Sequence, residues 1–187
     1  MPPRIKITKE DIINAAVELV RSSGVQAINA RTIASMLKCS TQPIFSNFTT
    51  MEELYLEVVK KSDMICNDYI KQEMEKGQYP AYKASGMAYI CFAKEEKELF
   101  KLLYMRNREN EIVPESSELG DKMQSIVTSN TGLNNETAKL FHLEMWAFVH
   151  GIAAMFATGF LNLEDALVSR MLTDAYQGLR KQYGMEQ

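Results

Sequence analysis

The sequence predicts an all-α protein of about nine helices, with a three-helix N-terminal head followed by a larger helical body. Apolar residues recur along the chain at helical spacings, and no stretch keeps the period-two alternation of a half-buried strand. Asn-Gly and Asp-Gly hairpin turns are absent, and so are internal repeats. Apolar residues make up 46% of the 187 residues, which excludes a disordered chain and allows a packed core.

The head is predicted to cover residues 1–50, and its first helix has a recognisable start and end. Thr8 and Asp11 have the spacing of a capping box, in which each side chain hydrogen-bonds the backbone N–H of the other residue. Apolar residues between positions 12 and 20 then form one stripe along the helix. Gly24 is expected to end this helix as a left-handed cap.

The body is predicted to cover residues 51–187 and to be helical throughout. A polar stretch broken by Pro114 separates its first three helices from the rest. Helices are expected over residues 52–76, 79–94, 96–108, 121–129, 134–158 and 162–183, the last with Asn162 as its cap.

One segment of the body approaches the length of a membrane span. Residues 145–163 carry no formal charge. However, the segment contains His150, and Gly159 followed by Asn162 indicates that one helix ends and another begins there. We therefore expect a helix buried in the core or in an interface, with a transmembrane helix as the alternative.

The charge of the chain is unevenly divided. The formal net charge is -3, which taken alone argues mildly against nucleic acid as a partner. Residues 1–61 hold eight basic and six acidic side chains, whereas residues 62–187 hold 13 basic and 18 acidic ones. The 33 residues between Glu18 and Glu52 contain no acidic side chain. A surface that meets phosphates must avoid carboxylates, so this window is suited to DNA.

Three cysteines without a C-x-x-C pair suggest neither a zinc site nor a redox pair. Free thiols and an N-terminal segment without an apolar stretch predict a cytoplasmic protein. No H-E-x-x-H motif, nucleophile–base pair or phosphate-binding loop can be read, so we expect no metal, no cofactor and no catalytic residues.

The acid-free window also carries the pattern of a helix-turn-helix. Two short helices are expected over residues 30–37 and 41–48, the second capped by Ser40, with Ala34 where the two helices cross closely. The outward face of the second helix then consists of short hydroxyl and amide side chains, which hydrogen-bond base edges and phosphate oxygens. An ordinary helical hairpin with a solvated polar face is the alternative.

Residues 6–61 resemble the DNA-binding head of the tetracycline-repressor-type (TetR) regulators. The resemblance rests on the segments IINAAVELVRSSGVQAI, RTIASML, CSTQPIFSNF and MEELYLEVV, and WAFVHGIAAM is similar to the penultimate helix of that family. It implies a dimer formed through the last two helices, a palindromic double-stranded DNA operator and a small-molecule effector bound in the body. The sequence departs from the family pattern with Lys38 for glycine, Phe45 for tyrosine and Met51 for lysine.

We assign Gln42 and Asn47 to base reading, with Pro43 and Ser46 beside them. By resemblance, Thr41, Phe45 and Thr49 line the phosphate side, although Phe45 could equally belong to the core. Arg31 is expected to reach the groove or a phosphate, or else to form a surface salt bridge, and Arg4 and Lys6 form either an arm along DNA or a frayed terminus. The expected DNA-binding residues are therefore Arg31, Thr41, Gln42, Pro43, Phe45, Ser46, Asn47 and Thr49.

For the effector, the resemblance implies a cavity among the middle helices of the body. The expected ligand-binding residues are Phe100, Tyr104, Met105, Phe141, His142 and Trp146. For the polar residues His142, Glu144 and His150, ordinary hydrogen-bonded side chains are the default. The function expected is a ligand-responsive repressor, with an activator of the same fold as the first alternative and an all-helical enzyme or carrier as the second.

Overall fold

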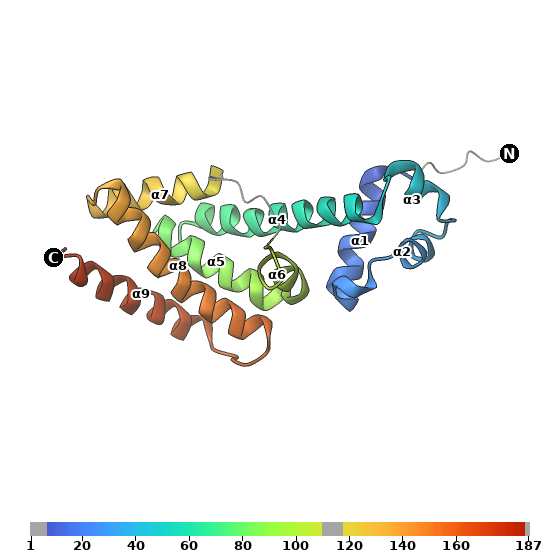
Figure 1. Cartoon of the computed structure of the whole chain (residues 1–187). Helices are drawn as coiled ribbons and strands as arrows, with labels where there is room; N and C mark the ends of the chain where they lie inside the picture. The colour runs from blue at the N-terminus through green and yellow to red at the C-terminus, as the bar shows by residue number, and fades with distance from the viewer. Residues whose placement is uncertain (1–6, 110–117, 186–187) are drawn as a thin grey trace. The chain divides into compact units, whose positions relative to one another are not determined.

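The computed structural model describes residues 7–109 and 118–185, and these residues contain no strand. Nine α-helices and one short 3-10 helix make up the described chain (Figure 1). They are α1 (Lys9–Ser23), η1 (Val25–Ala27), α2 (Ala30–Met36), α3 (Gln42–Asn47), α4 (Met51–Lys76), α5 (Ala81–Glu95), α6 (Lys97–Tyr104), α7 (Glu118–Thr131), α8 (Asn135–Ala157) and α9 (Asp165–Gln182). The predicted fold class is confirmed.

The helices group into two compact units. The first unit consists of Met1–Ile65 together with Glu96–Arg106, and the second of Cys66–Glu95 together with Asn107–Gln187. The 26-residue helix α4 therefore contributes to both units. The boundary expected from sequence, after residue 50, lies just before α4 begins.

The start of α1 follows the expected capping box. The Thr8 hydroxyl accepts from the Asp11 backbone N–H at 3.1 Å, and the Asp11 carboxylate accepts from the Thr8 backbone N–H at 2.9 Å. At the other end Gly24 has φ 76° and ψ 170°. Its φ is positive as expected, but its ψ is extended, so the residue is not in the left-handed helical region. Glycine is needed there because this combination of angles is essentially closed to other residues.

The helix-turn-helix forms as expected, with different boundaries for its second helix. α2 begins at a capping box in which the Asn29 side chain accepts from the backbone N–H groups of Arg31 and Thr32. α3 begins after Thr41, whose side chain makes no capping hydrogen bond. Ser40 is therefore not the N-cap. Pro43 in the first turn of α3 instead helps to start the helix, because its ring fixes φ near the helical value and no donor is lost.

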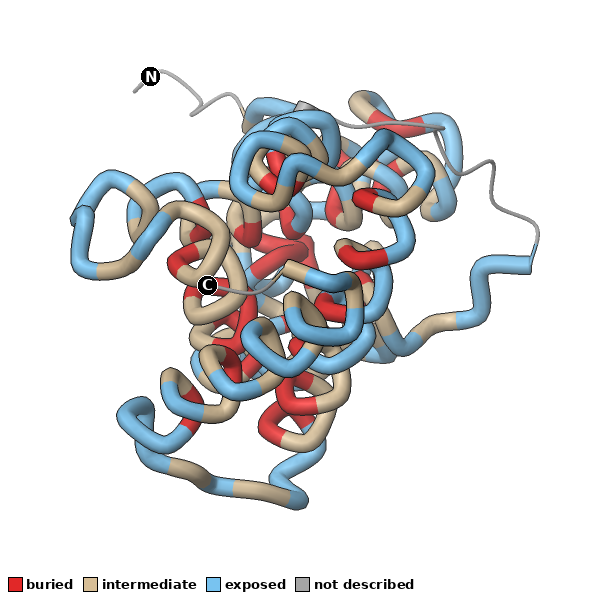
Figure 2. Tube along the Cα trace, turned by 90° about the vertical axis from the view of Figure 1, so that its left-hand side faces the viewer, coloured by how far each residue is buried: buried red, intermediate tan, exposed pale blue. Residues whose placement is uncertain are grey.

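The core of the first unit joins α1, α2, α3 and the start of α4. Its buried members are apolar side chains at helical spacings, and Figure 2 shows such buried positions alternating with exposed ones along each helix. They include Ile12, Ala16, Val20, Ile33, Ala34, Ile44, Phe48, Leu54 and Val58. Leu37 and Cys39, at the turn between α2 and α3, are only half-buried.

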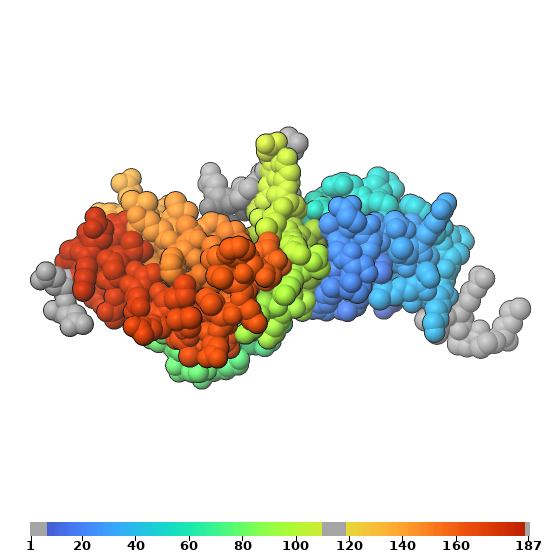
Figure 3. Space-filling view, turned by 90° about the horizontal axis from the view of Figure 1, so that it is seen from below, coloured from blue at the N-terminus to red at the C-terminus, as the bar shows by residue number. Residues whose placement is uncertain are grey.

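Helix α6 belongs to the first unit although it is distant from α1 in sequence. The Arg21 guanidinium near the end of α1 donates from Nε and Nη2 to the two carboxylate oxygens of Glu96, at 2.9 and 2.8 Å. Figure 3 shows the yellow-green segment of α6 against the blue of α1. Leu99 and Leu102 on α6 are also buried. A two-pronged ion pair and an apolar face therefore hold α6 on α1.

The second unit is a bundle in which α5 and α8 run side by side, with α7 and α9 packed against them (Figure 1). One core cluster gathers around Phe141, whose ring lies edge-on to Tyr176 and Tyr183 with centroids 5.5 and 5.6 Å away. Gly86 on α5 allows a close approach, since a Cβ there would lie 3.5 Å from both Val149 and Leu172. Small and aromatic residues thus set the packing of this unit.

The segment expected to be buried or interfacial, residues 145–163, forms the second half of α8 and the connection that follows it. By length and composition alone, Asn135–Ala157 could cross a membrane, and 39% of its most apolar window is buried inside the protein. Gly159, at φ 73°, follows the end of α8 as expected. The next helix starts later than expected, at Asp165 with Glu164 as its cap, so Asn162 is not the cap of α9.

Candidate nucleic-acid interface

Helix α3 buries one side and exposes the other. Ile44 is fully buried and Phe48, which follows the helix, is 2% exposed, so these two residues anchor α3 on the unit. Successive residues are about 100° apart around a helix, which places Gln42 and Ser46 on the opposite side, and both are exposed. Phe45 lies on one flank of this face and is 54% exposed. The expectation that Phe45 could be a core residue is therefore wrong.

The polar side chains of α3 are not equally available. The Ser46 hydroxyl donates to the backbone carbonyl of Gln42 at 2.9 Å, and the Asn47 amide donates to the carbonyl of Pro43 at 2.8 Å. Such bonds to the preceding turn are common for short polar side chains in helices. The Gln42 side chain makes no hydrogen bond with any residue that the structure describes. Gln42 therefore offers both its donor and its acceptor to a base.

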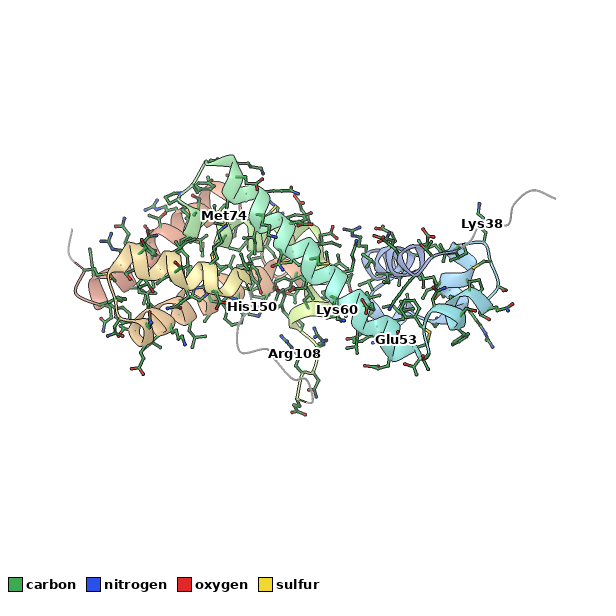
Figure 4. The ribbon with its side chains drawn as sticks, turned by 90° about the horizontal axis from the view of Figure 1, so that it is seen from above. Lys38, Glu53, Lys60, Met74, Arg108 and His150 are labelled. Carbon is green, nitrogen blue, oxygen red and sulfur yellow. The ribbon has the colours of Figure 1, made fainter. Side chains whose placement is uncertain are left out.

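Two cations beside α3 have no acidic partner among the residues that the structure describes. Arg31 on α2 and Lys38 in the turn are exposed, and neither forms an ion pair within the described chain. Figure 4 shows Lys38 extending away from the helices. In contrast, the Lys9 Nζ atom lies 3.6 Å from a carboxylate oxygen of Glu53. The other described basic residues up to position 61 also form ion pairs: Arg21 with Glu96, Lys60 with Glu57 and Lys61 with Glu10. Within residues 7–61, unpaired positive charge is thus confined to the helix-turn-helix.

The remaining expected DNA-binding residues lie around the ends of α3. Thr41 and Pro43 are half-buried at its start, and Thr49 is exposed after its end. The backbone N–H of Thr49 donates to the Glu53 carboxylate at 2.8 Å, so it is already occupied. Arg4 and Lys6 lie outside the described residues. The structure thus places all eight expected residues on or beside the helix-turn-helix, with Arg31 contributed by α2.

The expected ligand-binding residues divide between the two units. Phe100 and Tyr104 lie on α6 in the first unit, with ring centroids 5.0 Å apart, and Met105 caps that helix and is 48% exposed. Phe141 and Trp146 lie on α8 in the second unit. Phe141 is fully buried, whereas Trp146 is 41% exposed. Their role in binding stays a prediction.

The two histidines of α8 are each hydrogen-bonded to a tyrosine of α5. The Nδ1 atom of His142 lies 2.8 Å from the Tyr82 hydroxyl, and that of His150 lies 2.9 Å from the Tyr89 hydroxyl. The indole of Trp146 stacks on His150 with centroids 4.9 Å apart. Burial lowers the pKa of both histidines, which favours the neutral ring.

Comparisons with known proteins agree with this architecture. A family model described as "Tetracyclin repressor-like, C-terminal domain" matches residues 82–175, just over half of the chain. The chain belongs to the TetR family. The fold of the TetR-like transcriptional regulator from Rhodococcus sp. RHA1 is similar, with a TM-score of 0.68 and 16% identity over 96% of this chain and 98% of that one. A crystal structure of a protein described as regulatory, SCO4313, is similar with the same score and identity over 89% and 94%. No curated protein matches in sequence.

Membership of the TetR family makes this protein a transcriptional regulator and not an enzyme. DNA binding is implied for such a regulator, and the helix-turn-helix of α2 and α3 is the element with the geometry for it. Among the described residues, no group of three or more His, Cys, Asp or Glu side chains could hold a metal ion. Burial raises the pKa of Cys91 to about 11, so this thiol is protonated at neutral pH.

Sequence reasoning missed the partners of the polar residues in α8 of this TetR protein. Tyr82 and Tyr89 pair with the two histidines, and the Tyr183 hydroxyl donates to Glu144 at 2.9 Å. A signal was present, because Tyr82 and Tyr89 are seven residues apart and so lie on one face of α5. The expected default of ordinary hydrogen-bonded side chains is what the structure shows at these positions.

Proposed function

We propose that this TetR-family regulator is a cytoplasmic, dimeric repressor that binds a palindromic operator and is released by a small-molecule effector. The observation that carries the proposal is the surface of the helix-turn-helix. It presents an unoccupied amide on Gln42 and two unpaired cations, Arg31 and Lys38, with no carboxylate in the surrounding 33-residue window.

This surface suits DNA for two separate reasons. Arg31 and Lys38 can approach phosphates without first leaving an acidic partner, so they contribute affinity for any sequence. Gln42 can pair bidentately with adenine through N6 and N7, which contributes sequence preference. A helix presenting its N-terminal residues to base edges is the docking geometry of helix-turn-helix proteins.

An exposed stripe on α8 supports the dimer. Leu140 and Leu143 are 50% and 56% exposed, and the small residues Ala147 and Gly151 continue the stripe at helical spacing. A Cβ placed on Gly151 would meet nothing within 4 Å, so the surface there is open. On α9, Leu167 is also 47% exposed. Two copies joined through these helices would bury this apolar surface in a four-helix bundle.

Release by an effector requires a ligand that prefers one of two states of the protein. The contact of α6 with α1 supports a link between body and head, because Glu96 and Arg21 tie a segment carrying Phe100 and Tyr104 to a helix of the DNA-binding head. An effector that displaces α6 would therefore also displace α1.

The test begins with selection of bound duplexes from a random library by the full-length protein. The selected sequence should be palindromic, with half-sites about 10 base pairs apart or a multiple of that. Affinity for the selected duplex is then measured at two salt concentrations. Arg31→Gln and Lys38→Gln should each weaken binding to all sequences alike and reduce the salt slope by about 1 per protomer.

A matched control is Lys60→Gln, which removes a paired lysine from α4 and should leave the salt slope unchanged. The absence of binding to any duplex would overturn the proposed function. Selection of a single, non-repeated half-site would overturn the dimeric arrangement alone.

A further inference from the structure

We propose that Phe45 reads thymine by packing its ring against the C5-methyl group in the major groove. This inference rests on the proposed function, since it assigns specificity to a residue of the same DNA-binding helix. It starts from the exposure of Phe45, which at 54% is large for an aromatic ring on a small, well-packed unit.

The surroundings of Phe45 give its ring no structural role within the unit. The core beneath α3 is completed by Ile44 and Phe48, which are both buried. No aromatic or cation contact of Phe45 occurs among the described residues. A partner can therefore bury the exposed part of the ring without breaking a contact inside the unit, and this burial is favourable.

Base reading by the other side chains of α3 is restricted, which gives Phe45 a larger share of the specificity. The Ser46 hydroxyl and the Asn47 amide each donate a hydrogen bond to a backbone carbonyl of their own helix, at 2.9 and 2.8 Å. Gln42 remains as the free polar reader on the exposed face. A hydrogen-bonding amide and an apolar ring then flank the same helix face, and each would recognise a different feature of the groove.

The chemistry of DNA limits what an apolar ring can meet. Phosphate oxygens are charged and hydrated, and covering them with a phenyl ring removes water without replacing its hydrogen bonds. In the major groove, the thymine methyl is the apolar group on a base edge. A phenyl ring without a hydroxyl group cannot donate to a phosphate, so the methyl group is the favourable contact.

Replacing thymine by uracil in the selected duplex tests this directly, because only the methyl group is removed. For the unmodified protein, this change at one position in each half-site should weaken binding about fourfold per half-site. The ratio of thymine to uracil affinity should be the same at two salt concentrations, because no counterion is involved. Phe45→Ala should bring this ratio to 1, and Phe45→Tyr should retain it.

Met36→Ala is the matched control. Met36 is 46% exposed on α2, so its truncation removes a similar apolar surface outside α3 and should leave the ratio unchanged. The proposal is overturned if the protein binds its selected duplex but uracil has no effect at any position, which would indicate a contact to sugar or phosphate. It is also overturned if Phe45→Ala, folded by circular dichroism, keeps the full ratio. Absence of binding to all duplexes would instead overturn the proposed function, and this proposal with it.

Discussion

Lys38 shows how a single backbone conformation shapes the turn between α2 and α3. Its φ of 52° is the one positive value among the described non-glycine residues. The turn needs this conformation so that the Cys39 backbone N–H can reach the Ala34 carbonyl at 2.9 Å and close the end of α2. A side chain at such a position costs roughly 1–2 kcal/mol, which the packing of the turn must offset. Lys38 is also one of the two cations without an ion-pair partner among residues 7–61.

Lys38→Gly should stabilise the protein by roughly 1 kcal/mol, because the lost steric strain exceeds the added flexibility of the unfolded chain. Lys38→Ala keeps the Cβ atom and removes the charge, so it should leave the free energy of unfolding nearly unchanged. Urea unfolding of the three proteins measures the difference. Equal stabilisation by both variants would show that charge, and not backbone strain, is responsible.

Gln42→Ala should weaken operator binding by about 1–3 kcal/mol and relax the preference at one base position. The reason is that the Gln42 amide has no partner within the described chain and is free for a bidentate contact. Ser46→Ala on the same face is the comparison, and it should weaken binding less, because the Ser46 hydroxyl already donates to the Gln42 carbonyl and keeps only its acceptor. The affinity of each variant for duplexes with single base changes shows whether the preference at one position is lost. Equal weakening on all sequences would make Gln42 a backbone contact.

At the scale of the elements, capping residues determine where the short helices of the head begin. Asn29 accepts two backbone N–H groups at the start of α2, and Thr32 completes the capping box. α3 has no side-chain cap and only six residues, so it depends on Pro43 and on the burial of Ile44. The two helices of the motif are therefore stabilised in different ways, one locally and one by packing.

Asn29→Ala should lower the free energy of unfolding by about 1 kcal/mol, because α2 loses the acceptor for two backbone donors. Ser40→Ala should have little effect, since α3 starts after Thr41 and receives no cap from Ser40. Thermal unfolding followed by circular dichroism compares the two. A larger loss for Ser40→Ala would contradict the boundary of α3 in the structure.

At the scale of the whole molecule, contacts between helices distant in sequence organise each unit. In the first unit, Arg21 and Glu96 join α1 to α6. In the second, the hydrogen bonds of Tyr82 and Tyr89 to the histidines of α8 join α5 to α8. The two tyrosine–histidine hydrogen bonds are partly buried, where a hydrogen bond is stronger and a missing partner is costly, whereas the Arg21–Glu96 pair is exposed.

The second unit should lose stability as the pH falls below about 6.5. Burial lowers the folded-state pKa of His142 and His150 from 6.5, so in this range the unfolded chain binds more protons than the native one. The stability is therefore fully present above pH 6.5 and is lost progressively down to the lowered pKa values. The free energy of unfolding, measured between pH 5 and 8, should fall as the pH falls. The double variant His142→Asn and His150→Asn should show a weaker dependence of this free energy on pH. An unchanged slope in the double variant would assign it to other groups.

Leu143→Glu should convert the dimer to a monomer, because it places a charge in the exposed apolar stripe of α8 that we propose to join two copies. Met64→Glu is the control, because Met64 is an exposed apolar side chain, 59% accessible, on α4. Analytical ultracentrifugation gives the mass of each variant. A dimer that survives Leu143→Glu would place the interface elsewhere.

Local signals were sufficient for most of the fold. The capping box at Thr8, the apolar stripe of α1 and the bounds of α4 depend on residues close in sequence, and all three were predicted correctly. Gly24 has the positive φ of the expected left-handed cap but an extended ψ, so that prediction was only partly correct. Helix starts were misplaced at Ser40 and Asn162, where a plausible cap residue precedes the true start by a few positions. The cap residue at each site depends on how the flanking chain packs, which sequence alone does not contain.

The sequence by itself determined the all-helical fold, the helix-turn-helix and the acid-free window, because helical periodicity, capping and charge are local properties of the chain. The tertiary structure decided which side chains of the helix-turn-helix are available to contact DNA. In the structure, the Ser46 and Asn47 donors bond their own helix, while Gln42 and Phe45 are exposed. Among the basic residues described between positions 7 and 61, all form ion pairs except Arg31 and Lys38. Availability depends on rotamers and on neighbours distant in sequence, such as Glu96 for Arg21, and only the packed chain brings these together.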